Sequence, residues 1–160
     1  MYVKGFSLVE VLVAMALVAS SALGLAELFA LAARVTQASR IDTVMTMAAE
    51  TKMAELRGLT WAYDPAGGGA PISDPALATS PASALRTNTS GFVDFIDGAG
   101  AVVGVGTAAP RQGVYLRRWS IAPMPADPVN TLVLQVMAAP VTRPASRDVH
   151  LISILSRTAQ

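Results

Sequence analysis

The first 35 residues read MYVKGFSLVEVLVAMALVASSALGLAELFALAARV. This stretch decides the fold, because the 28 residues of segment 6–33 include only two charged side chains, Glu10 and Glu27. A bilayer hydrocarbon core of about 30 Å is crossed by roughly 20 mostly apolar helical residues. The sequence therefore predicts a membrane-spanning helix over residues 6–33.

The order of basic residue, glycine and apolar stretch separates this segment from an ordinary secretory signal. In a secretory signal the small-residue cleavage site follows the apolar stretch. Here Lys4 and Gly5 both precede it. A cut after Gly5 would remove residues 1–5 as a leader peptide and keep the apolar helix in the mature chain. The alternative is a signal-peptide cut near Ser20-Ser21-Ala22, but the apolar run continues well beyond that point.

Glu10 is the physically unusual residue of the apolar segment. A carboxylate at mid-bilayer costs roughly 2.5–3.5 kcal/mol, so we expect Glu10 to have a partner. Cleavage after Gly5 would give Phe6, four residues before Glu10, a free α-amino group that is mostly cationic at neutral pH. In a filament core, the amine of one subunit paired with Glu10 of its neighbour would set the axial register. The alternative is a Glu10 side chain at the lipid headgroup level with no role in assembly.

The order of Gly5, Phe6, Ser7-Leu8-Val9 and Glu10, followed by VLVAMALVA, resembles the class III leader of type IV pilins and type II secretion pseudopilins. In that family a membrane aspartyl peptidase, prepilin peptidase, cuts after the glycine and methylates the new amine. The resemblance therefore implies that Gly5 and Phe6 are the processing residues. It implies an assembly role for Glu10, because the family's acidic position falls there.

The same resemblance implies partners and a location. The expected partners are prepilin peptidase, other pilin or pseudopilin subunits, the inner-membrane assembly platform and membrane lipid. We expect a single-pass protein of the bacterial inner membrane, with its C-terminal domain in the periplasm before incorporation into a pilus or pseudopilus.

The helix is expected to continue as an amphipathic half over residues 34–58. Apolar side chains recur there at helical spacing, which suits packing on a sheet; they are Val35, Ala38, Ile41, Met45, Ala48, Met53 and Leu56. Gly58 is the predicted stop, with Arg57 beside the negative end of the helix. Many major pilins carry a proline in the membrane half, and this chain has none there. Glu27, about 25 Å from Glu10 by helical rise, is either a snorkelling interface charge or a salt-bridge partner for another pilin.

Beyond the helix, residues 59–91 are rich in proline and glycine and are predicted to form a long irregular connection. Residues 92–160 are predicted to form an antiparallel headgroup sheet of about 3–5 strands. The expected strands cover residues 92–96, 101–105, 114–121, 131–138 and 149–157, with a break at Asp127-Pro128. The fold class expected is α+β and pilin-like, with the amphipathic helix covering the sheet.

The sequence favours no enzymatic chemistry. The chain contains no cysteine and one histidine, His150, and no metal-ligand spacing or catalytic triad accompanies it. We expect no catalytic residue, cofactor or metal. The net charge of +1 and the scattered arginines give no reason to expect a specific nucleic-acid partner. Arg117-Arg118-Trp119 is predicted to be a solvated strand face with one buried aromatic, the alternative being a small binding patch.

These observations lead to two functional hypotheses. The first is a structural subunit, which most resembles a minor pilin of the type IV pilus modification group or a minor pseudopilin of the I/J group. The second is a single-span, membrane-anchored periplasmic module that captures DNA or a secreted substrate and does not polymerise. Leader processing separates these two hypotheses poorly, whereas substitution of Glu10 separates them well, because only the first hypothesis gives this residue a role in assembly.

Overall fold

The computed structural model describes residues 5, 7–64, 66–142 and 148–159. The chain divides into two compact units, Met1–Ile41 and Asp42–Gln160. Helix α1, Leu8–Arg57, begins in the first unit and ends in the second. The predicted stop is confirmed, because α1 ends immediately before Gly58, whose N–H donates to the carbonyls of Ala54 and Glu55 at 3.0 and 3.1 Å.

The first unit presents an apolar helix surface without cover of its own. Every residue from Ser7 to Gln37 is exposed within the chain. In the part of the chain that the structure describes, α1 is the one helix long and apolar enough to cross a membrane. Residues 8–33 of an α-helix rise about 39 Å, which exceeds the hydrocarbon core of a bilayer. The N-terminal part of α1 is therefore suited to lipid or to other helices.

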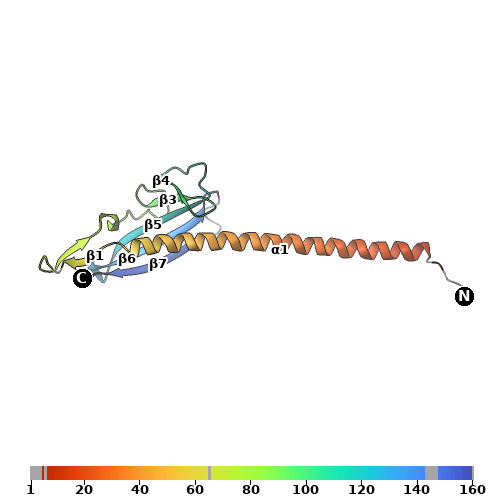
Figure 1. Cartoon of the computed structure of the whole chain (residues 1–160), viewed down its shortest axis with the longest axis horizontal. Helices are drawn as coiled ribbons and strands as arrows, with labels where there is room; N and C mark the ends of the chain where they lie inside the picture. Colours follow the sequence, from red (N-terminus) through yellow and green to blue (C-terminus); the bar gives the residue numbers. More distant parts are fainter. Residues whose placement is uncertain (1–4, 6, 65, 143–147, 160) are drawn as a thin grey trace. The chain divides into compact units, whose positions relative to one another are not determined.

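The second unit contains a five-stranded sheet in the order β4-β3-β5-β6-β7, drawn from green to blue in Figure 1. All four pairs of neighbouring strands are antiparallel. The strands are β3 Val93–Ile96, β4 Val102–Val105, β5 Tyr115–Met124, β6 Asp127–Pro140 and β7 Val149–Ser156. With α1, they confirm the predicted pilin-like α+β fold and match the five expected strands.

The hairpin between β5 and β6 differs from the prediction. The expected break at Asp127-Pro128 is wrong. The chain turns at residues 125–126, and Asp127 and Pro128 are the first two residues of β6. The carboxylate of Asp127 accepts hydrogen bonds from the amide side chain of Asn130 at 3.0 Å and from the Thr131 hydroxyl at 3.2 Å. These bonds hold the start of β6 in place, so an Asp-Pro pair that usually marks a loop sits at a strand end.

The C-terminal part of α1 packs on one face of the sheet through side chains at three- and four-residue spacing. These are Met45, Ala48, Ala49, Lys52, Met53 and Leu56. The buried stripe is thus shorter than expected, since Val35 is 61% exposed. It also includes Lys52, which the sequence pattern leaves on the polar side.

The opposite face of the sheet has a core that sequence reasoning did not predict. Phe95, Leu116 and Met137 pack there with Val93 and Ala139, and partly buried side chains cover them. One of these, Leu85, comes from the segment before β3. A sheet covered on both faces explains why β3 is buried at all four of its residues, whereas a one-sided sheet would show alternation.

Residues 59–91, expected to be irregular, contain a hairpin and a short helix. β1, Trp61–Asp64, pairs antiparallel with β2, Ala70–Ser73, and the 3-10 helix η1 covers Pro75–Leu77. Gly68 and Gly69 adopt positive φ angles of 72° and 80° in the connection, a conformation that glycine enters freely. The glycine run is therefore part of a hairpin connection rather than of an unstructured linker.

The C-terminal residues join this hairpin to the rest of the second unit. β8, Thr158–Ala159, pairs parallel with β1. The Arg157 guanidinium stacks 3.5 Å from the centre of the Trp61 ring and donates to the carbonyls of Ala62 and Ile72 at 3.1 and 2.8 Å. Because its side chain contacts both hairpin strands and also donates to the Val129 carbonyl of β6 at 3.0 Å, Arg157 fixes the position of the hairpin.

Candidate functional site

The start of α1 is set by Ser7. The Ser7 carbonyl accepts the N–H groups of Glu10 and Val11 at 3.0 and 3.2 Å, and the helix begins at Leu8. Ser7 is therefore the N-cap residue, and Ser7-x-x-Glu10 has the spacing of a capping box, in which a glutamate favours the first helical turn. Sequence reasoning did not use this S-x-x-E spacing.

The predicted processing and assembly residues lie at this exposed end. Gly5 is exposed and precedes the helix, as cleavage in an accessible, non-helical segment requires. Glu10 lies in the first turn of α1, where a carboxylate interacts favourably with the positive end of the helix dipole. The side chain of Glu10 is exposed and has no ion-pair partner among the described residues. Phe6 lies outside the described residues.

In the second unit, Arg117 corrects the prediction of a solvated strand face. The residue is only 4% exposed, and its side chain forms a two-point ion pair at 2.8 and 2.7 Å with Asp94, which is also 4% exposed. Its third donor group reaches the Ala48 carbonyl of α1 at 3.1 Å. Arg117 is buried because Asp94 stands directly opposite it in the β3–β5 register and neutralises its charge. The pair joins helix to sheet.

Lys52 is the second buried charge on the helix face. Its ammonium group lies 4.0 Å from the centre of the Trp119 ring and 2.8 Å from the Glu55 carboxylate. The ring face and the carboxylate together stabilise the ammonium group, while the aliphatic part of the Lys52 side chain packs against apolar surface. Trp119 is buried as predicted. The group that faces its ring is Lys52 of α1.

Arg118 points to the other face and is bound by Asn88. Its Nε and Nη2 atoms donate to the Asn88 side-chain oxygen at 2.9 and 2.7 Å, while the Asn88 amide nitrogen donates to the Thr107 carbonyl at 2.9 Å. Burial lowers the pKa of the Arg118 guanidinium, and the Asp148 carboxylate opposes that shift. The side chain of Asn88 is thus held in structural hydrogen bonds on both its oxygen and its nitrogen. Arg117 and Arg118 serve separate packing roles and do not form one binding patch.

The described part of the chain offers no arrangement typical of a catalytic centre. His150 is exposed on the edge strand β7. No three His, Cys, Asp or Glu side chains in the described ranges gather to hold a metal ion. The candidate functional site that the sequence predicts is therefore the start of α1, around Gly5 and Glu10.

Comparison with known proteins places this segment in a family. Residues 1–26 match the family model described as the prokaryotic N-terminal methylation motif. No curated protein and no solved structure matches the chain. Proteins with this motif are structural subunits rather than enzymes, and the motif implies processing by prepilin peptidase and assembly with pilins. The chain thus carries the N-terminal methylation motif of the type IV pilin and pseudopilin family on a pilin-like α+β fold.

Proposed function

We propose that this chain is a minor pilin or minor pseudopilin, a structural subunit of a type IV pilus or a type II secretion pseudopilus. The observation that carries the proposal is the continuity between the motif and the fold. The matched residues 1–26 include the beginning of α1, Leu8–Arg57, whose far end packs on an antiparallel sheet. A cleaved signal sequence would have no reason to form one uninterrupted helix with the domain that follows it.

The proposed roles at the N-terminus follow from the chemistry of each residue. Prepilin peptidase cuts after Gly5, where the backbone is exposed and outside the helix. The new amine of Phe6 is methylated. Glu10 then binds the amine of a neighbouring subunit, since its carboxylate is exposed on an apolar helix and an unpaired charge is costly in that environment. Before assembly, α1 anchors the chain in the bacterial inner membrane with the second unit in the periplasm.

A minor role is favoured over that of a major, fibre-forming subunit. No proline precedes Pro65 in the sequence, so the membrane half of α1 lacks the residue that many major pilins carry there. The chain also contains no cysteine and therefore has no disulfide-closed C-terminal loop. These features support a subunit that contributes few copies to a filament.

The competing proposal is a membrane-anchored binding module that does not polymerise. Fractionation of sheared filaments distinguishes the two, because the inner membrane remains with the cells while filaments are released. We expect the mature chain in the filament fraction, at a small fraction of the amount of the most abundant subunit, measured by quantitative mass spectrometry with labelled peptides. A cytoplasmic-membrane protein measured in the same fractions is the control for contamination.

The opposite results would contradict the proposal in different ways. Complete retention in the inner membrane, in cells that make filaments, would favour the anchored module. An amount equal to that of the most abundant subunit would exclude the minor role while leaving a pilin function intact.

A further inference from the structure

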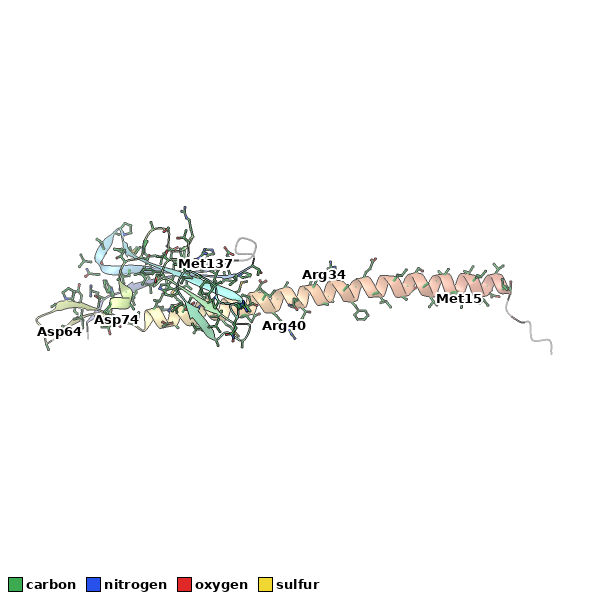
Figure 2. All side chains as sticks on the ribbon, turned by 90° about the horizontal axis from the view of Figure 1, so that it is seen from above. Met15, Arg34, Arg40, Asp64, Asp74 and Met137 are labelled. Atoms are coloured by element: carbon green, nitrogen blue, oxygen red, sulfur yellow. The ribbon has the colours of Figure 1, made fainter. Side chains whose placement is uncertain are left out.

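A surface cleft of about 330 Å³ lies in the second unit, where the end of α1 meets the sheet. Its walls come from the last turns of α1, from η1 and from the residues just before β3. Figure 2 labels Asp74, the residue that precedes η1, near this end of α1. The wall residues Ala76, Ala78 and Gly91 are exposed, so the cleft opens to solvent. Its volume is at the lower end of the range for ligand sites.

Trp119 lines this cleft and has a hydrogen-bond donor that the described residues leave unused. The residue is 8% exposed. In the described part of the chain no group accepts from its indole N–H, whereas the indole of Trp61 donates to the Asn130 carbonyl at 3.0 Å. Every fully buried side-chain donor that the structure describes has a partner, so the Trp119 N–H reaches accessible space. A tryptophan this buried usually donates to an acceptor, and a ligand in the cleft would supply one.

Lys52 brings further donors to the same cleft. This residue is also 8% exposed. An ammonium group has three N–H donors, and among the described residues the Glu55 carboxylate, at 2.8 Å, is its one hydrogen-bond acceptor. Because Glu55 balances the charge of Lys52, the cleft does not select for an anion. It offers N–H donors to a neutral acceptor instead.

The remaining surface of the cleft is mainly apolar. The ring of Phe92 lies 6.5 Å from the Trp119 ring, with the two planes tilted by 56°, and Pro75 is exposed on the wall. Grooves lined by aromatic rings are the type of surface that binds extended proline-rich segments. A segment in the polyproline II conformation has main-chain carbonyls that take part in no internal hydrogen bond, and its prolines have no N–H donors of their own.

We propose that this cleft binds a proline-rich segment of another protein in the polyproline II conformation. The Trp119 N–H and the Lys52 ammonium donate to main-chain carbonyls of the segment, and its prolyl rings pack on Phe92 and Pro75. The donors identify the occupant, because the cleft has an excess of donors and a proline-rich segment has an excess of acceptors. The site lies in the second unit and goes beyond the proposed role of the N-terminal helix in assembly.

The wall formed by η1 is held in place before any ligand binds. The Asp74 carboxylate accepts the N–H of Ala76 at 2.8 Å. After η1, the N–H of Ser80 donates to the Ile121 carbonyl of β5 at 2.9 Å, and the Ser80 hydroxyl accepts the Ile121 N–H at 3.0 Å. These bonds fix both ends of the wall, so binding needs little ordering of the cleft.

Fluorescence polarisation of a labelled peptide of about ten prolines, titrated with the purified full chain in detergent, tests the proposal. We expect saturable binding, which a peptide of equal length made of glycine and serine should not show. Trp119→Phe keeps an aromatic ring beside Lys52 but removes the indole N–H, and it should weaken binding about fivefold through the loss of one hydrogen bond. Trp61→Phe changes the tryptophan outside the cleft and is the matched control, with binding equal to that of the wild type.

A second variant tests the location without changing a buried residue. Ala76 is exposed, so Ala76→Glu should leave the urea midpoint unchanged while its longer side chain occupies the cleft and weakens binding by about tenfold or more. If Trp119→Phe fails to fold, Ala76→Glu decides the question. Absence of binding by the wild type, equal binding of the glycine-serine peptide, or wild-type affinity in either folded cleft variant would overturn the inference. Because the purified chain is measured, none of these results depends on whether the chain enters filaments.

Discussion

Replacing Glu10 with valine is expected to leave cleavage after Gly5 intact and to reduce incorporation into filaments by about 30-fold or more. The reason is that the variant leaves the amine of a neighbouring subunit unpaired in an apolar core. Loss of one partner of a desolvated charge pair costs about 2 kcal/mol or more, and each ~1.4 kcal/mol is a factor of ten. Incorporation is measured as the amount of mature chain in sheared filaments relative to the amount in the membrane.

A glutamine at the same position separates the effect of the Glu10 charge from an effect of the residue on the helix start. Glu10→Gln keeps the length of the side chain and the S-x-x-E/Q capping pattern with Ser7, but it removes the charge. If the ion pair is the important interaction, Glu10→Gln should be as defective as Glu10→Val. Near-normal incorporation of Glu10→Gln would show that Glu10 acts only in capping its own helix, and normal incorporation of both variants would exclude any assembly role.

Replacing Arg117 with alanine is expected to destabilise the second unit by about 3–5 kcal/mol. The substitution leaves the Asp94 carboxylate buried without a counter-charge, and removal of one partner of a buried pair has that cost. It also removes the bond to the Ala48 carbonyl, so contact between α1 and the sheet should weaken. A total stability of about 5–15 kcal/mol is usual for a domain, so the loss would be a large part of it. Urea unfolding of the full chain in detergent, followed by tryptophan fluorescence, measures the change.

Two control variants show whether the ion pair is responsible. Arg111→Ala removes an exposed arginine and should change the free energy of unfolding by less than about 0.5 kcal/mol. Arg117→Leu combined with Asp94→Leu removes both charges and should be less destabilising than Arg117→Ala alone, since apolar replacements of buried pairs are often tolerated. A double variant that is less stable than the single one would contradict this explanation.

The sequence was most informative where local rules decide the structure. The 28-residue segment with two charges, the absence of proline before Pro65 and the stop at Gly58 together predict α1, and its end is confirmed. β-branched and apolar runs predict β3 to β7, because each strand is bounded by glycine, proline or aspartate. These features depend only on neighbouring residues.

The missed features depend on contacts between distant residues. Arg117 looks like a surface residue until the strand register places Asp94 beside it, 23 residues earlier in the chain. Lys52 is buried only because Trp119 comes to lie under its ammonium group. The second core behind β3 arises because the segment containing Leu85 folds back over the sheet. Spacing along the chain contains no signal for any of these contacts.

The candidate site, in contrast, is made of residues that lie close together in the sequence. The proposed roles of Gly5, Phe6 and Glu10 rest on a linear motif, so they could be predicted from the sequence alone. The structure adds the helix start at Ser7 and the exposure of Gly5 and Glu10. The proposed pairing of Glu10 with another subunit would be a property of the assembly, and a single chain gives only the charge and its place on the helix.

The intact mass of the mature chain, purified from sheared filaments, tests the central claim most directly. The claim is that the chain is processed after Gly5, methylated on Phe6 and then assembled through α1. We predict a mass equal to that of residues 6–160 with one added methyl group, and fragmentation should place the methyl group on the amine of Phe6. A mature chain that retains Met1, or one that begins near Ser20-Ser21-Ala22 after removal of the apolar segment, would contradict the account.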